Sequence, residues 1–368
     1  MNLSCLWVSL RLGLHDLLGH RRLVLIMALS IAIATGMLAI VEAYRLGLAA
    51  EFNEPAPGLL QVHELQTSGE FYGSRVSSQV AEQLSSLGIR MIIPEIYAVT
   101  GASIQSATLV RGIDLAGYTR LETFSMLSGR SLHLGDAPRL AMLGVRLAES
   151  RHLKPGEAIS LRGRDFKIVG IFQNGTYMDN QAWISLADAQ SLLGWGRDVS
   201  AYVIPDEGIL RDGDVLPGGV SVSRKGESVR FFAAQYRLPM VLLGDVALAL
   251  VLSAALTLTS ILWRLAWARR REMTILRTTG FPTFTVVGYL LAQAGGITLL
   301  GLSLGGLFAL TFLVTVRLTV SGFTIVPRLD LPVVLPGLGW VALLMLAGSL
   351  LPAWWLGHLN LARLLHSE

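Results

Sequence analysis

The stretch RLAWARRREMTILRTTGFP, residues 264–282, is the most basic part of the chain and holds five arginines within fourteen positions. Long runs with almost no charge lie on both sides of it. A helix needs about 20 apolar residues to cross a bilayer, and the runs that reach this length are Leu23–Val41, Leu238–Trp263, 284–316 and Leu331–Gly357. The sequence therefore predicts four membrane-spanning helices, with the basic stretch between the second and the third.

The composition supports this prediction. The chain has 368 residues, of which 52% are hydrophobic and 15% are charged, and its mean hydropathy is +0.55. Soluble proteins carry about 25% charged residues, so this chain is not expected to be soluble throughout. The net charge of +4 comes largely from arginines that border the apolar runs, so it does not indicate nucleic-acid binding. Cys5 is the single cysteine, which excludes an internal disulfide.

The basic segments predict how the chain crosses the membrane. The first apolar run exceeds the roughly 7–15 residues of a signal-peptide core, so we interpret it as an uncleaved span. Short cytoplasmic loops are enriched in Lys and Arg, which places the basic stretch inside the cell. We expect a multi-pass protein of the cytoplasmic (inner) membrane with both termini inside. The predicted domains are a tail and first span (1–47), an extracytoplasmic domain (48–236), and three spans with a cytoplasmic helix at 266–280 (237–368).

The predicted extracytoplasmic domain mixes strand and helix patterns. Alternating polar and apolar residues predict strands at 58–65, 89–101, 102–113, 157–172 and 199–205. Helical patterns cover 77–88, 138–153 and 185–195, and residues 221–239 are predicted to run as a helix into the second span. The predicted fold class is an α-helical membrane protein with four transmembrane helices and a large α+β extracytoplasmic domain inserted between helices 1 and 2.

Catalytic signatures do not stand out in the sequence. A P-loop needs a lysine after a glycine in G-x-x-x-x-G-K-[ST], and Lys154, Lys167 and Lys225 do not fit that pattern. The histidines lack metal-ligand spacing. We therefore predict no catalytic residue, no metal site, no cofactor and no ATPase activity of the chain's own. Asn174–Thr176 matches a glycosylation sequon, and we interpret it as a turn.

Two carboxylates and two glycines in the apolar runs need an interpretation. Carboxylates within a membrane are candidates for function, but Asp245 and Glu42 fall near the outer interface, where we favour a structural role. Gly301 and Gly305 form a G-x-x-x-G pair, which lets helices approach closely in lipid. This pair is compatible with packing on a neighbouring span or on a second copy of the chain.

The basic stretch itself has the pattern of a short amphipathic helix. Residues 266–279 contain no glycine or proline, and Met273 and Leu276 share one face. Gly280 suits the left-handed position after a helix, and Pro282 suits the start of the next one. Two simpler interpretations remain open: a charged collar that only fixes topology, and a helix that lies on anionic lipid.

RRREMTILRTTGFP, residues 269–282, resembles a segment of the FtsX-like, or MacB-type (type VII), permeases of ABC transporters. The order of one span, an outer domain and three spans is also similar. Residues 163–194 resemble the strand-rich end of the family's periplasmic core domain, and residues 351–365 resemble its closing segment. That closing segment departs from the family pattern, which often has Asp-Pro at 360–361 and arginines at 354–355.

The resemblance implies that a separate ABC ATPase subunit binds the short helix and moves the extracytoplasmic domain, for export or extraction of a substrate. This is called mechanotransmission. It implies a second permease copy, as a homodimer, and allows a periplasmic adaptor; membrane lipid surrounds the spans. The alternatives are a transducer that controls an extracytoplasmic cell-wall hydrolase, as in cell-division members, and a sensor without an ATPase. The coupling surface implied is Arg270, Arg271, Glu272, Met273, Ile275, Leu276, Arg277 and Gly280.

Overall fold

The computed structural model describes residues 3–52, 58–67, 73–101, 107–121, 123–320 and 323–357. The chain divides into two compact units. The helical unit comprises Met1–Leu46, Leu238–Val316 and Pro327–Glu368. The sheet unit comprises Gly47–Arg237 and Arg317–Val326. The last ten of these residues join the sheet unit although they lie between two predicted spans.

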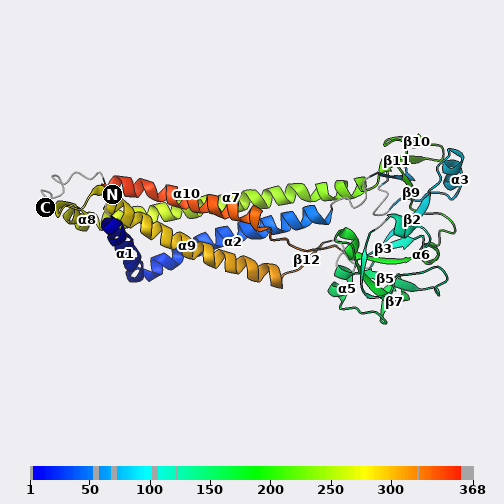
Figure 1. Ribbon diagram of the computed structural model, residues 1–368, viewed down its shortest axis with the longest axis horizontal. Coiled ribbons are helices and arrows are strands. Elements are labelled where there is room, and N and C mark those ends of the chain that lie inside the picture. The colour runs from blue at the N-terminus through cyan, green and yellow to red at the C-terminus, as the bar shows by residue number, and fades with distance from the viewer. Residues whose placement is uncertain are drawn as a thin grey trace. The chain divides into compact units, whose positions relative to one another are not determined.

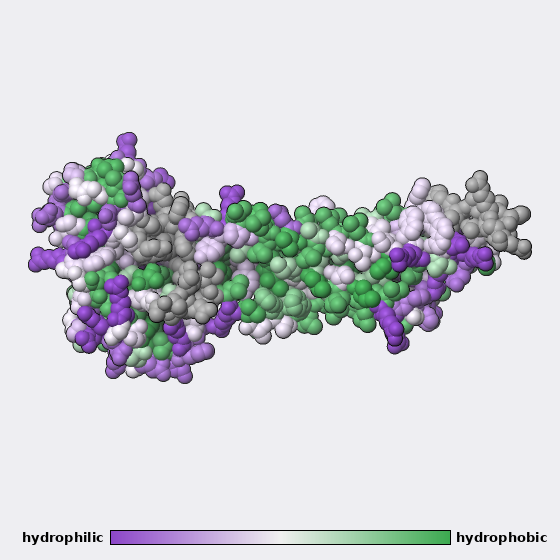
Figure 2. Space-filling view, turned by 180° about the vertical axis from the view of Figure 1, so that it is seen from behind, coloured by the Kyte–Doolittle hydropathy of each residue, from purple (hydrophilic) through white to green (hydrophobic). Residues whose placement is uncertain are grey.

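Four long helices confirm the four predicted spans. Each is long and apolar enough to cross a membrane, and they lie side by side in Figure 1. Apolar side chains cover much of these helices in Figure 2, as expected of surfaces that face lipid. The helices are α2 (Arg21–Glu51), α7 (Glu227–Ala268), α9 (Thr283–Thr315) and α10 (Leu331–Gly357).

Two shorter helices belong to the helical unit. α1 (Leu3–Gly19) precedes α2, and α8 (Arg270–Thr278) follows α7. The sequence predicted only a tail, and no helix, for the first of these segments. α1 lies close to α9, because a Cβ atom on Gly13 would stand 2.7 Å from the carbonyl oxygen of Tyr289.

Glycines also let α9 approach α2. A Cβ atom on Gly305 would stand 2.7 Å from the carbonyl oxygen of Ala32, and one on Gly301 would stand 2.6 Å from Cβ of Ile31. Both distances are too short for a side chain. The G-x-x-x-G pair therefore packs on a neighbouring span, which is one of the two arrangements that the sequence left open.

The sheet unit is built on one mixed sheet. Among the described residues, eleven strands form it in the order β10-β11-β1-β9-β2-β3-β8-β5-β7-β4, with β6 beside β7. Only the pairs β3–β8 and β5–β7 are parallel within this set. The strands are β1 (Leu59–Glu64), β2 (Ile93–Thr100), β3 (Thr108–Ile113), β4 (Ser125–Gly129), β5 (Leu140–Gly144), β6 (Ala158–Leu161), β7 (Arg164–Gln173), β8 (Gln181–Ser185), β9 (Ala201–Pro205), β10 (Val215–Leu216) and β11 (Val220–Arg224).

Short helices and a hairpin complete the sheet unit. Apolar side chains from one face of the sheet, such as Leu60 and Val62, form a core with residues of α3, α5 and α6. The α+β class predicted for this region is therefore confirmed. The elements are α3 (Gln79–Ser86), α4 (Tyr118–Leu121), α5 (Val145–Arg151), the 3-10 helix η1 (Tyr177–Asn180), α6 (Leu186–Leu193), and the hairpin of β12 (Leu318–Val320) and β13 (Phe323–Ile325).

Two helix predictions in this unit are wrong in part. Residues 138–153 contain the strand β5 before the helix α5 begins at Val145. β5 is a buried inner strand between β7 and β8, and a short apolar run of that kind cannot be distinguished from a helix by periodicity. Residues 221–239 likewise begin in the strand β11 before α7 starts. The predicted strand at 102–113 lies partly outside the described residues.

Candidate partner-docking site

The basic stretch folds as a helix of nine residues between two bends. α7 ends at Ala268, Arg269 has non-helical backbone angles (φ −98°, ψ 12°), and α8 begins at Arg270. Gly280 has a φ of +98°, which confirms the predicted left-handed residue after the helix. Its N–H donates to the carbonyl of Arg277 and so satisfies one of the carbonyls at the helix end.

α8 turns its apolar face toward the rest of the helical unit. Met273 is 7% exposed and belongs to the same core as Val286 and Tyr289 of α9. The sequence placed Met273 on the surface for a partner, whereas the structure places it in the chain's own core. An amphipathic helix buries its apolar face against whatever covers it, and here the spans cover it. Thr274 is buried as well.

The exposed side of α8 carries one large apolar residue among charges. Ile275 is 60% exposed, and the side chain of Glu272 is 66% exposed. Arg271 is also exposed, whereas Leu276 and Arg277 are half-buried. The structure therefore divides the predicted coupling residues into an outward group and an inward group.

Arg270 is held at the end of α7. Its guanidinium lies 4.6 Å from the ring centroid of Trp267 and donates to the carbonyl oxygen of Trp267 at 2.9 Å. Trp267 and Trp263 both stack on Trp355 of α10, with centroids 5.3 and 5.2 Å apart. Trp355 is one of the two tryptophans at positions where the family often has arginines, and its ring joins α7 to α10.

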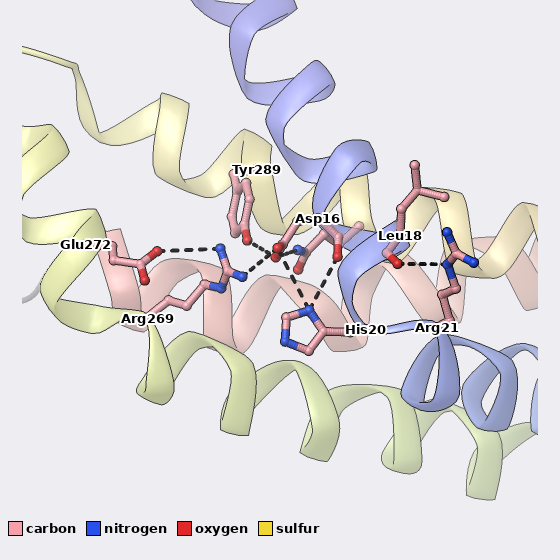
Figure 3. Close-up of polar contacts among 8 residues, drawn as sticks. Asp16, Leu18, His20, Arg21, Arg269, Glu272 and Tyr289 are labelled. Atoms are coloured by element: carbon pink, nitrogen blue, oxygen red, sulfur yellow. Dashed lines mark hydrogen bonds and ion pairs between the residues drawn. The ribbon is translucent and has the colours of Figure 1, made fainter.

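A carboxylate of α1 binds both α9 and the bend between α7 and α8 (Figure 3). Asp16 accepts hydrogen bonds from Arg269 and Tyr289, each at 2.5 Å, and from Gln293 at 2.9 Å. His20 lies beside it, with Nδ1 3.8 Å from the carboxylate of Asp16. We call these five residues the Asp16 cluster. Charge-assisted hydrogen bonds of this length are among the strong ones in proteins.

The Asp16 cluster fixes the bend before α8. The guanidinium of Arg269 contacts Asp16 with one nitrogen and Glu272 with the other, the latter at 3.5 Å. A pocket of about 190 Å³ opens beside these groups, lined in part by Leu12, Met273 and Leu276. Asp16 was not among the site residues predicted from the sequence. Its only signal was an acidic residue among the arginines of the N-terminal segment.

Of the other candidate groups, Glu42 and Asn174 have structural explanations. Glu42 pairs with Arg45 of the same helix, with oxygen and nitrogen 2.5 Å apart, and Asp245 is exposed on α7. Asn174 donates to the carbonyl of Thr123 at 2.6 Å in a turn where Gly175 has a φ of +83°, which confirms the turn. Within the described residues, no group of three or more His, Cys, Asp or Glu side chains is placed to hold a metal ion.

Comparisons with known proteins identify the family. The model of the MacB-like periplasmic core domain matches residues 23–212, which is more than half of the chain. The chain belongs to the MacB-type permease family. Family membership and the four apolar helices make it a membrane protein. The match covers most of α2 and most of the sheet unit.

Curated relatives of this MacB-type permease bear the name uncharacterized ABC transporter permease. ABC transporter permeases described in this way from Mycobacterium tuberculosis and Mycobacterium bovis are 25% identical to it over 179 residues. The alignment covers 47% of this chain and 50% of each relative, so the chain spans about half the length of the curated relatives it matches.

Two solved structures are similar in part. One is the periplasmic region of MacB from Actinobacillus actinomycetemcomitans, with 12% identity, a TM-score of 0.35, and coverage of 49% of this chain and 94% of that one. The other is a domain of a putative permease from Porphyromonas gingivalis, with 15% identity, a TM-score of 0.29, and coverage of 46% and 90%. These TM-scores are low, so the family assignment rests on the domain match.

Proposed function

We propose that this chain is the permease subunit of an ABC transporter and that α8 is where a separate ATPase subunit binds. The observation that carries the proposal is the fixed presentation of α8. Its inner face is buried in the helical unit, and its first turn is tied to α1 and α9 through Arg269 and Asp16. A helix held in this way presents Ile275 and the charges around it to a partner in one orientation.

The outward side of α8 has the composition of a small docking surface. An exposed apolar residue is the kind of anchor that fills a pocket on a partner, and Ile275 is of this kind. Glu272 and Arg271 beside it offer charges that set the orientation through charge-assisted hydrogen bonds. Met273 belongs to the helical unit's core in this scheme and acts only indirectly.

Movement of α8 has two routes into the spans. α8 follows α7 after a single residue, Arg269, so force on α8 reaches α7 through the backbone. Arg269 also binds Asp16 of α1, which continues through His20 into α2. Transmembrane helices satisfy their backbone hydrogen bonds internally and behave as stiff levers. On this account ATP hydrolysis by the partner moves the extracytoplasmic sheet unit, and the substrate is exported or extracted there.

The proposed function also implies an orientation in the membrane and further partners. The arginines around α8 favour a cytoplasmic position for it, which puts both termini inside and the sheet unit outside the inner membrane. A second copy of the chain and a periplasmic adaptor complete the proposed assembly. The exposed apolar surfaces of the spans face lipid or that second copy.

Purification of the full-length chain in mild detergent tests the proposal. We expect a nucleotide-binding ATPase subunit to co-purify with the wild type and its recovery to fall at least about tenfold with Ile275→Asp, because a charge replaces the apolar anchor. Val215→Asp is the matched control, since Val215 is 62% exposed in the sheet unit; it should leave recovery unchanged. Equal recovery of the ATPase with Ile275→Asp, or no ATPase with the wild type, would contradict the proposal.

A further inference from the structure

The last residue of α2 is a buried carboxylate inside the sheet unit. Glu51 is 1% exposed and forms an ion pair with Arg146 of α5, whose side chain is 11% exposed. Nδ2 of Asn180 donates to Glu51 at 2.9 Å. A buried charge is tolerated only when ion pairs and hydrogen bonds compensate its desolvation, and both are present here. The end of α2 is thus fixed by polar contacts as well as by the chain.

Asn180 also contacts the segment that joins α9 to α10. Its Oδ1 accepts a hydrogen bond from the backbone N–H of Thr324 in β13, at 2.8 Å. The β12–β13 hairpin is the connection between those two helices. The side chain of Asn180, which is 1% exposed, therefore binds the end of α2 through its nitrogen and the α9–α10 connection through its oxygen.

The support under Asn180 is rigid. Its neighbour Asp179 accepts the backbone N–H groups of Asn174 at 2.6 Å and Gly175 at 3.0 Å, which fixes η1. A Cβ atom on Gly144 would overlap the backbone of Asp179, so the glycine lets α5 begin directly against η1. Arg146, in the first turn of α5, lies 4.0 Å from Asp179 as well as beside Glu51.

A second ion pair between α5 and the hairpin gives a natural contrast. Arg317 and Glu149 are 3.2 Å apart, but their side chains are 61% and 57% exposed. Exposed pairs contribute little, because water and salt screen them. The buried contacts of Asn180 and Glu51, and not this surface pair, are therefore the ones expected to hold the hairpin and α2 in place.

We infer that Glu51, Arg146 and Asn180 form a joint, the α2 joint, that fastens the end of α2 and the α9–α10 hairpin to one platform made of α5 and η1. The three are positioning residues. All three lie within the sheet unit, as do the last residues of α2 and the α9–α10 connection that they bind. The attachment is a property of the chain alone; its use in transmitting motion rests on the proposed function.

Hydrogen exchange of the full-length chain in detergent tests the attachment. Asn180→Ala removes the shared amide, so exchange should rise about tenfold or more in both 44–51 and 317–326. Glu51→Gln keeps an oxygen for Asn180 and removes the charge that Arg146 binds, so 44–51 should respond and 317–326 should not. The surface control Glu149→Gln should change both segments by less than about twofold.

Two results would contradict the α2 joint. The first is that 44–51 and 317–326 exchange as slowly in Asn180→Ala as they do in Glu149→Gln. If Asn180→Ala also exposes β5, the sheet unit has been disrupted, and Glu51→Gln decides: unchanged exchange in 44–51 would then overturn the joint.

The transmission role has a separate readout in the complex with the ATPase subunit. Adding ATP should change the exchange of the sheet unit in the wild type and in Glu149→Gln, and this change should be lost in Glu51→Gln while the ATPase stays bound. A full response in Glu51→Gln would overturn the transmission role. A wild type with no bound ATPase or no ATP response would instead contradict the proposed function and leave the first test standing.

Discussion

The Asp16 cluster and the α2 joint use the same chemistry in different surroundings. Each pairs a carboxylate with an arginine and adds a side-chain amide, Gln293 in the first and Asn180 in the second. Asp16 is 13% exposed and its arginine 28%, against 1% and 11% in the joint. Charges near water interact more weakly than buried ones. The Asp16 cluster is therefore expected to be the weaker attachment of the two, and the α2 joint the stronger.

The same substitution at both carboxylates should separate the two clusters most widely. Removing one partner of a buried pair leaves the other charge uncompensated, so Glu51→Ala should lower the local free energy of opening by about 3–5 kcal/mol. Asp16→Ala leaves Arg269, whose side chain is 28% exposed, free to bind water, but it removes an acceptor from the buried Tyr289 and Gln293. A loss of about 1–3 kcal/mol is therefore expected. Hydrogen exchange of 44–51 in Glu51→Ala and of 270–278 in Asp16→Ala measures the two values. A larger loss at Asp16 would reverse the comparison.

The stability of η1, which supports the α2 joint, should also depend on pH. Burial raises the pKa of Asp179, even though the backbone N–H of Asn174 opposes the shift. A raised folded-state pKa gives a stabilising contribution that is complete below the unfolded pKa of about 4 and is lost as pH rises through the folded value. The free energy that protects η1 should therefore fall over that interval, and Asp179→Asn should flatten the profile.

Asp136 is the control for this pH profile, because its pKa is shifted in the opposite direction. The hydrogen bond from Arg130 holds the pKa of Asp136 below its usual range. Its contribution is present above the unfolded pKa and is lost as pH falls through the folded value. Asp136→Asn should therefore change the profile only at acid pH. An unchanged slope above the unfolded pKa in Asp179→Asn would show that Asp179 does not cause it.

The smallest expected effect is at the rim of the Asp16 cluster. Glu272 is 66% exposed and 3.5 Å from Arg269, so Glu272→Gln should change the free energy that protects 270–278 by about 0.5 kcal/mol or less. Hydrogen exchange of that segment measures it. A loss comparable to that of Asp16→Ala would mean that Glu272, and not Asp16, fixes α8.

The features that depend on local sequence could be predicted. Span length follows from runs of apolar residues, and the left-handed Gly280 follows from its place after a helix. The sequence could not predict what covers the apolar face of α8, because a partner and the chain itself would need the same apolar residues. Met273 shows this most clearly, since it lies in the core.

The two clusters could not be found from the sequence for a different reason. Asp16 binds a residue 253 positions away, and Asn180 binds Glu51 across 129 positions and Thr324 across 144. Contacts at such separations are set by the tertiary fold. Local patterns also misassigned β5, because burial on both faces removes the alternation that marks a strand.

α8 can bind a cytoplasmic ATPase subunit only if it faces the cytoplasm and is accessible there. In a Cys5→Ser background, which removes the single native cysteine, Ile275→Cys and Val215→Cys are expressed without an ATPase subunit, and intact spheroplasts are treated with a membrane-impermeant maleimide. We expect Val215→Cys to react in intact spheroplasts and Ile275→Cys to react only after permeabilisation. Reaction of Ile275→Cys in intact spheroplasts would place α8 outside the cell and contradict the account.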